Sequence, residues 1–497
     1  MTTILAHPPE IEATLALRTI VEAASRERFL AAVREAGRAD RPFDVERLQG
    51  LMAIEEHFQA LLLYDQIELL RQPPPMAPPH HELALAVQRF WLEAANGLQR
   101  FLRHRGAWDV DAESQELARR ATGLAVNAIH GFVKWGYHLD GAARPVPWRQ
   151  LHTLFLLAER DGFAPAPLVL HPSQPSFSPS VRTLYLRTLL LDLLNRGSLT
   201  RIQVEIADGW LSSWCDQYAL ETEYLPGEHL LFVDPSGEQG MRLVRGAAPG
   251  AAARYLGAAR LRAQIDEVQA GLRHGRLFSG HGAGAVFPVE QHVALLAIID
   301  KQRRCILDAG SDPIEERCPL TDREADVAPG LEAVLRKARA PASPDDGGIE
   351  RWRVHDLSPH GFGFLVDGDA ALRVVLNDLL AIRNQQSGEW IVATVVRKLS
   401  TAVAGEVLVG AEVLCYRPVA LDLGDPKAAQ AREALFLPGA DGDGRLDAIL
   451  MRAAHFTPVA GCTVRAGGAD YRVRPNRIIR KGADWVIARF EVSSKAA

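Results

Sequence analysis

The chain has 497 residues, of which 47% are hydrophobic and 24% are charged. This balance is that of a globular protein with a core of ordinary size, and it excludes a globally disordered chain. At roughly 150 residues per domain, the length predicts about three domains. The 56 Lys and Arg residues face 61 Asp and Glu residues, so the formal net charge of -5 excludes a strongly basic protein that coats nucleic acid.

The cysteine spacing and the N-terminal segment indicate the cellular compartment of the protein. No pair of cysteines has C-x-x-C spacing, which argues against a disulfide framework and a zinc ribbon and favours a reducing cytoplasm. The N-terminal segment MTTILAHPPE lacks a basic region followed by an apolar one, and no run of 18 apolar residues exists. We therefore expect a cytoplasmic protein with no membrane insertion. The five cysteines are Cys215, Cys305, Cys318, Cys415 and Cys462.

The first 300 residues have a helical pattern, because apolar residues recur three and four positions apart. The Pro-rich segment 73–79 and the Gly-containing ends at 161–162 and 195–197 divide this pattern into separate helices. Short connections favour an antiparallel array of helix pairs that somewhat resembles a tetratricopeptide solenoid, although no clean 34-residue period is present. The expected helices cover residues 10–35, 45–70, 82–103, 112–139, 147–161, 181–196, 252–273 and 289–304.

A β-hairpin interrupts this helical pattern near residues 228–245. Its two apolar runs flank the turn Asp234-Pro235-Ser236-Gly237. We expect the helical region to span residues 1–300, with this hairpin as an insertion.

From about residue 311 the chain consists of short β-branched or aromatic segments separated by Gly, Asp or Ser turns. Short strands without long intervening helices favour a small antiparallel barrel, which we assign to residues 311–422. Residues 341–348 are polar and predict a loop. Residues 430–497 predict a C-terminal β extension or a second barrel. The expected fold class is therefore α+β.

One internal echo supports a second barrel. Val395-Val396-Arg397-Lys398 precedes a strand that contains Glu412-Val413, and Ile478-Ile479-Arg480-Lys481 precedes one that contains Glu491-Val492. Two unrelated hairpins would give the same pattern by chance. The alternative is a pair of related barrels packed side by side.

The most informative motif is Asp356-Leu357-Ser358-Pro359-His360-Gly361, which follows a predicted strand. Asp and Ser side chains bond to nearby backbone groups in tight turns, and Gly permits a positive φ or the close approach of a ligand. A carboxylate at such a turn also suits the N–H donor edge of a guanine. An ordinary turn between two strands is the alternative interpretation.

The pattern Asp356-x-Ser358-x-x-Gly361, at the end of an early barrel strand, resembles the D/N-x-S-x-x-G signature of the PilZ family. PilZ domains are six-stranded barrels that bind the bacterial second messenger cyclic di-GMP. The resemblance covers about residues 311–420. It implies that Asp356 and Ser358 contact a guanine edge and that Gly361 shapes the turn.

The family's second element, R-x-x-x-R, does not occur between residues 300 and 350. Two arginines suit the ligand because guanidinium groups bind phosphate and stack on purines. Arg317 lies nearest the expected place, with Arg323 as a candidate irregular partner, so the resemblance implies that both bind phosphate or stack on a guanine. The alternatives are solvated surface arginines and a degenerate barrel that binds a protein instead.

Other charged segments carry weaker signals. Arg474, Arg477, Arg480 and Lys481 make the last hairpin basic, either as a solvated edge or as a group that meets phosphates from the neighbouring barrel. No His, Cys or carboxylate cluster has metal-ligand spacing, so we expect no metal and no cofactor.

The leading hypothesis is a non-enzymatic bacterial signalling receptor. Its barrel would bind cyclic di-GMP, and its helical region would bind an unidentified protein partner. The second hypothesis is a scaffold whose degenerate barrel and helices both serve protein contacts. The third hypothesis is an enzyme. The sequence does not favour it, because it contains no paired catalytic motif, no phosphate loop and no metal cluster.

Overall fold

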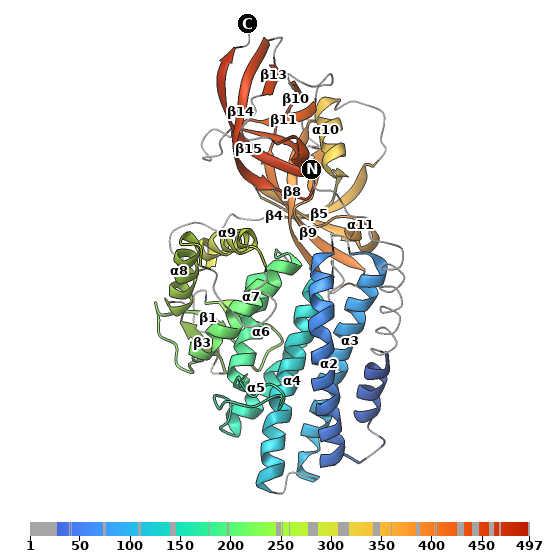
Figure 1. Cartoon of the computed structure of the whole chain (residues 1–497), viewed down its shortest axis with the longest axis vertical. Helices are drawn as coiled ribbons and strands as arrows, with labels where there is room; N and C mark the ends of the chain where they lie inside the picture. Colours follow the sequence, from blue (N-terminus) through green and yellow to red (C-terminus); the bar gives the residue numbers. More distant parts are fainter. Residues whose placement is uncertain are drawn as a thin grey trace. The chain divides into compact units, whose positions relative to one another are not determined.

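The computed structural model forms two compact units, Met1–Asp312 and Pro313–Ala497, which are described separately. The first unit is helical and the second consists of β-barrels (Figure 1). This confirms the α+β class and the second barrel, whereas the three domain ranges expected from the sequence stay predictions. The structure describes residues 27–495 apart from 39, 41, 73–75, 108–110, 140–145, 177, 196–197, 245–249, 251, 258, 277–286, 307–317, 341–347, 359, 384–387, 402, 404, 425–431, 440–446, 457–461 and 467–468.

Most of the helices lie where apolar spacing predicts them. Asp44 and Asp111 cap α2 and α4 by accepting hydrogen bonds from backbone N–H groups three residues later. Thr200 and Gln203 form a capping box at the start of α7. The helices are 27–36, α2 (Val45–Arg71), α3 (Pro78–Arg103), α4 (Ala112–His138), α5 (Trp148–Arg160), α6 (Val181–Asn195), α7 (Arg201–Trp214), α8 (Ala259–Arg273) and α9 (Val289–Ile306).

Helix α4 is the centre of the helical unit, since it contacts α2, α3, α5, α6 and α7. Small residues let its neighbours approach closely. A Cβ at Gly131 would lie 2.7 Å from the ring of Trp91, and one at Gly123 would lie 2.7 Å from a methyl group of Leu170. In a solenoid each helix pair contacts only its neighbours. The helical region is therefore a bundle around α4, not a stack of repeated pairs.

A small sheet accompanies the bundle. The expected hairpin is present as β1 (His229–Val233) and β2 (Arg242–Leu243), and β3 (Arg254–Gly257) pairs with the other edge of β1. The prediction of a helix from residue 252 is wrong for this stretch, because the helix begins at Ala259. Tyr255 and Leu256 are buried as strand residues, which the helical spacing of the surrounding alanines obscured.

The second unit contains two closed antiparallel barrels of six strands, with the orders β4-β5-β6-β9-β8-β7 and β10-β11-β12-β15-β14-β13. The first barrel consists of β4 (Cys318–Pro329), β5 (Glu350–Ser358), β6 (Gly361–Asp367), β7 (Leu379–Arg383), β8 (Trp390–Ser400) and β9 (Glu406–Cys415), with α10 (Leu331–Arg339) and α11 (Gly368–Leu372) between strands. The second consists of β10 (Val419–Gly424), β11 (Arg432–Leu437), β12 (Ala448–Arg452), β13 (Cys462–Ala466), β14 (Ala469–Lys481) and β15 (Trp485–Lys495). The expected loop at 341–348 lies almost wholly outside the described residues.

Each barrel has its own apolar interior, and a third apolar cluster joins the two. Trp352 and Phe364 belong to the interior of the first barrel, and Met451 and Val473 to that of the second. The joining cluster combines α10 with outward-facing side chains of β7 and β8 and of β11, β12 and β15. Trp485 belongs to it, and its Nε1 donates to the carbonyl oxygen of Asn377 at 3.0 Å.

The two barrels share one topology, since both have the strand order first, second, third, sixth, fifth, fourth. Their registers match as well. The β8–β9 ladder has a bulge between Val395 and Arg397, and the β14–β15 ladder has one between Ile478 and Arg480. The internal echo in the sequence therefore corresponds to equivalent strands of two like barrels.

Candidate functional site

A β-bulge in β5 turns the motif residues out of the first barrel. Val354 lies opposite Phe364, and both side chains belong to the core. The register then shifts, and Asp356 lies opposite Gly363. The neighbours of Gly363 on β6, Phe362 and Phe364, pack inward, so Gly363 and Asp356 lie on the outer face.

Four residues form a line across four strands of this outer face, which we call the Asp356 row. Register pairs Asp356 with Gly363, Gly363 with Gly410, and Gly410 with Arg397. The row spans roughly 14 Å, or three interstrand spacings. Its glycines give room to the charged groups at its ends: a Cβ at position 363 would lie 2.7 Å from Asp356 Oδ2, and one at 410 would lie 3.3 Å from Arg397 Nε.

A second line, the Ser358 row, runs beside the first and consists of Ser358, Gly361, Glu412 and Thr394. Gly361 does not have a positive φ, and the reason for glycine there is a close approach, because a Cβ would lie 2.6 Å from the carbonyl oxygen of Ala411. The Thr394 hydroxyl is buried and has no hydrogen-bond partner among the described residues. This hydroxyl is a polar group whose hydrogen-bonding capacity is unused.

The second barrel shows what the same face is like without the motif. The equivalents of the Asp356 row are Leu435, Leu450, Ile487 and Arg480. The equivalents of Ser358 and Gly361 are Leu437 and Ala448. These apolar side chains belong to the cluster that joins the barrels. The same framework thus carries an apolar packing surface in one barrel and a glycine-lined polar surface in the other.

Asp356 and Ser358 are largely buried, with 8% and 5% of their surfaces exposed. Asp356 Oδ2 lies 2.9 Å from His355 Nδ1, and Ser358 Oγ lies 3.5 Å from the carbonyl oxygen of Gly361. The motif is therefore a compact turn whose carboxylate is already in contact with polar groups.

Of the two predicted arginines, Arg323 does not lie in these rows. Arg323 is exposed, and the register places it opposite Val354, whose side chain belongs to the barrel interior. Arg317 lies outside the described residues. The arginine that the register brings into line with Asp356 is Arg397, which the sequence motif did not select.

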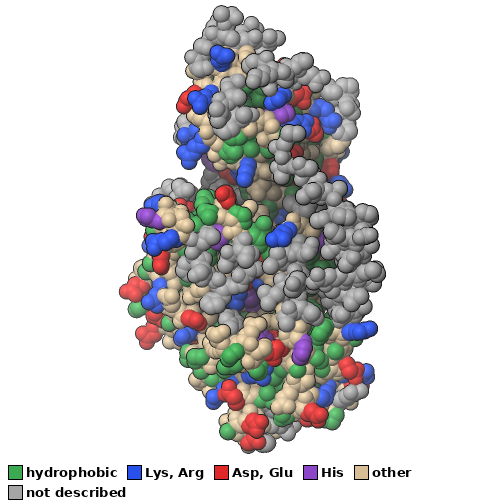
Figure 2. All heavy atoms as spheres, in the orientation of Figure 1, with side chains coloured by type: hydrophobic (Ala, Val, Ile, Leu, Met, Phe, Trp, Pro, Cys, Tyr) green, Lys and Arg blue, Asp and Glu red, His purple; other side chains and the backbone are tan. Residues whose placement is uncertain are grey.

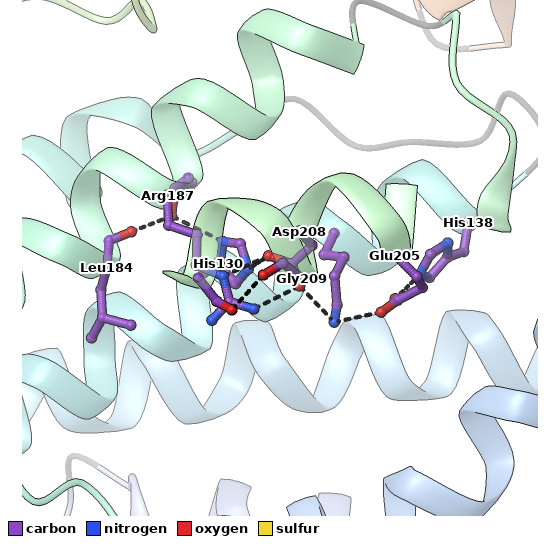
Figure 3. Close-up of polar contacts among 10 residues, drawn as sticks. His130, His138, Leu184, Arg187, Glu205, Asp208 and Gly209 are labelled. Carbon is purple, nitrogen blue, oxygen red and sulfur yellow. Dashed lines mark hydrogen bonds and ion pairs between the residues drawn. The ribbon is translucent and has the colours of Figure 1, made fainter. Parts of the chain in front are cut away.

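A separate polar cluster lies inside the helical bundle (Figure 3). His130, Lys134 and His138 occupy successive turns of one face of α4 and meet Asp208 and Glu205 of α7. Arg187 of α6 completes it, with Nε and Nη2 donating to the two carboxylate oxygens of Asp208 at 2.5 and 2.7 Å. Lys134 Nζ bridges the two carboxylates at 3.1 and 3.3 Å.

Opposite charges meet in this cluster. Burial alone would raise the pKa of Asp208, but Arg187 and Lys134 outweigh it, and the pKa lies well below its ordinary value. Burial lowers the pKa of His130, which favours the neutral ring. Two ionised carboxylates thus face two cations, and the cluster holds α4, α6 and α7 together.

Residues 13–225 match the family model described as the N-terminal domain of the cyclic-di-GMP receptor FimW. The match covers less than half of the chain and lies in the helical unit. It does not lie in the barrel on which the resemblance to PilZ rests. Comparison with curated proteins and comparison with solved structures both find no match.

Among the described residues, no helix is long and apolar enough to cross a bilayer, and no three His, Cys, Asp or Glu side chains are grouped as metal ligands. The face seen in Figure 2 carries Lys and Arg side chains interspersed with acidic and apolar ones, not one area of a single sign.

Two signals for these sites were present in the sequence. Spacing of four residues between His130, Lys134 and His138 puts them on one helix face. The shared Arg-Lys of the internal echo marked Arg397 and Arg480 as equivalent. Neither signal reveals its partners, because these come from other strands and helices.

Proposed function

We propose that this protein is a non-enzymatic, cytoplasmic receptor for cyclic di-GMP, and that the ligand binds on the outer face of the first barrel. Asp356 accepts hydrogen bonds from a guanine edge, Ser358 contacts the same base, and Gly361 keeps the turn tight. Arg317 and Arg323 remain candidates for the phosphates. The helical region relays binding to a protein partner.

Two independent lines support this proposal. The N-terminal match is to a family whose description is that of a cyclic-di-GMP receptor. The observation that carries the proposal is the contrast between the barrels, where Asp356, Ser358, Gly361, Gly363 and Gly410 replace apolar side chains. Three glycines and a carboxylate are unfavourable on a face that only packs, because glycine has no side chain to bury and a buried carboxylate costs free energy.

Isothermal titration calorimetry with pure cyclic di-GMP tests the proposal. We expect wild type to bind and Asp356→Ala to lose binding, because the guanine N–H groups then have no charged acceptor. Asp369→Ala is the matched control, since Asp369 is an exposed carboxylate on the same barrel. Absence of heat with wild type at millimolar ligand would contradict the receptor function.

A scaffold is the second candidate. Two observations favour a barrel that binds no nucleotide: Asp356 is largely buried, and Arg323 lies outside the Asp356 row. This alternative predicts that the chain captures its protein partner equally well with and without cyclic di-GMP. A receptor predicts that the ligand changes the partner affinity of wild type but not of Asp356→Ala.

A further inference from the structure

An arginine of the second barrel contacts the outer face of the first barrel, on which the motif residues lie. Arg480 of β14 places Nη1 2.9 Å from Glu412 Oε2 of β9. Glu412 lies in the Ser358 row, directly opposite Gly361 of the motif. Both side chains are 26% exposed, so the pair stands at the edge of the apolar cluster between the barrels, within reach of solvent.

Arg397 supplies a second cation to the same face from within the first barrel. Its guanidinium lies over Gly410, which pairs with Gly363, and Gly363 in turn pairs with Asp356. Arg397 and Arg480 occupy equivalent positions after equivalent bulges, so one local structure presents both side chains. The two cations lie beside the outer face of the first barrel, where Gly363 and Gly410 leave space above the strands.

We propose that Arg397 and Arg480 bind the phosphates of cyclic di-GMP on this face, so that the site is shared by the two barrels. The inference rests on the proposed function and adds two cations to the upstream candidates Arg317 and Arg323. Arg480 exchanges its carboxylate partner Glu412 for a phosphate oxygen when the ligand binds. Arg397, at the opposite end of the row from Asp356, binds the other phosphate. A doubly charged ligand is the class that such a pair of arginines suits.

The Ser358 row adds a reason for a ligand at this place. Thr394 lies opposite Glu412, and its buried hydroxyl has no partner among the described residues. A ligand that displaces Glu412 toward solvent brings a new hydrogen-bond partner to that hydroxyl. The equivalent position in the second barrel holds Arg477, which lies opposite Arg489 and is exposed.

Calorimetry with cyclic di-GMP on the full chain tests the inference. We expect Arg480→Gln and Arg397→Gln each to weaken binding at least about tenfold, the usual effect of losing a charged hydrogen bond to phosphate. Arg477→Gln is the matched control, because it removes the same charge three residues away on the same strand. It should change the dissociation constant by less than about twofold.

Glu412→Gln separates a ligand contact from a purely structural ion pair. If Arg480 acts only by bridging to Glu412, both variants weaken binding equally. If Arg480 binds phosphate, Glu412→Gln frees the guanidinium and binds at least as tightly as wild type. Thermal unfolding midpoints confirm that each variant is folded.

The outcomes distinguish the two levels of the proposal. Wild type that does not bind overturns the receptor function. Wild type that binds, together with Arg480→Gln and Arg397→Gln that bind equally well, overturns the shared site alone. Equal loss in Arg480→Gln and Glu412→Gln also overturns it.

Discussion

Arg397 and Arg480 are equivalent residues of two barrels that face different surroundings. Each follows a bulge and precedes a lysine, yet Arg397 lies opposite Gly410 and Arg480 lies opposite Ile487. Ile487 fills the space that Gly410 leaves open, and it packs in the cluster between the barrels. One framework therefore serves for packing in the second barrel and for a polar surface in the first.

Two glycine substitutions distinguish binding from folding. Gly363→Ala puts a methyl group against the Asp356 carboxylate, a movable side chain, whereas Gly361→Ala puts it against the backbone oxygen of Ala411. We expect Gly363→Ala to lose cyclic di-GMP binding with less than about 1 kcal/mol of destabilisation, because the side chain can rotate away. Gly361→Ala should cost about 1–3 kcal/mol, because the β6–β9 pairing must shift.

Denaturant unfolding and calorimetry on both variants measure these effects. Gly368→Ala provides a comparison, since its methyl group also meets a backbone oxygen, that of Gly405, but away from the motif. If Gly363→Ala binds the ligand as well as wild type, ligand binding does not depend on the observed position of the Asp356 carboxylate.

The sequence predicted the elements better than their contacts. Apolar spacing located α2 and α4 to within a residue or two, because buried helices impose that spacing over many turns. The sequence pattern does not reveal strand β3, because this strand has only four residues and lies between alanine-rich segments. The motif turn at Asp356 was visible from local chemistry alone.

The rows were not predictable in the same way. Asp356 and Arg397 share a row only because of three successive strand registers and the bulge at His355. A shift of one residue in any ladder would send the side chain to the opposite face. Distance along the chain favours Arg323 as a phosphate ligand, but it carries no information about strand register, and the register places Arg323 opposite Val354.

The ion cluster of the bundle predicts a large loss of stability on removal of one charge. Asp208→Asn keeps the size of the side chain but leaves Arg187 and Lys134 with a single buried carboxylate. We expect a loss of about 3–5 kcal/mol in the free energy of unfolding. Glu116→Gln should change it by less than about 1 kcal/mol, because its pair with Arg119 is exposed.

Urea unfolding followed by circular dichroism in the helical region of the spectrum measures both variants. Asp208 also contributes to acid sensitivity. Its pKa is lowered in the folded state, so its contribution is present above the ordinary value of 3.8 and is lost as the pH falls through the folded-state pKa. Equal stability of Asp208→Asn and wild type at pH 7 would show that the cluster is energetically neutral.

His130 predicts a second, milder pH dependence in the same unit. Burial, the largest effect, lowers its pKa below 6.5, so the folded protein binds fewer protons than the unfolded chain as the pH falls past that value. Stability attributable to His130 is therefore complete above pH 6.5 and declines below it. His130→Gln should flatten the dependence between pH 5 and 7, whereas His57→Gln, at an exposed ring, should not.

Asp378 of the first barrel predicts a dependence of the opposite sign. Burial, followed by the nearby Asp484 of the second barrel, raises its pKa to about 6. The folded state then holds a proton that the unfolded chain releases near pH 3.8, so stability from this group is complete below pH 3.8 and is lost as the pH rises through about 6. The loss amounts to about 2 kcal/mol, because two pH units correspond to about 3 kcal/mol and the half-buried carboxyl is partly screened.

Asp378→Asn removes this loss, since the amide oxygen can still accept from the backbone N–H of Val375, which lies 2.8 Å from Asp378 Oδ2. We expect the variant to exceed wild type in stability by more at pH 7.5 than at pH 4.5, as measured by urea unfolding at both values. Asp369→Asn, at an exposed carboxylate, should show no such difference. Parallel pH profiles of Asp378→Asn and wild type would mean that the barrel interface keeps this carboxyl ionised at little cost.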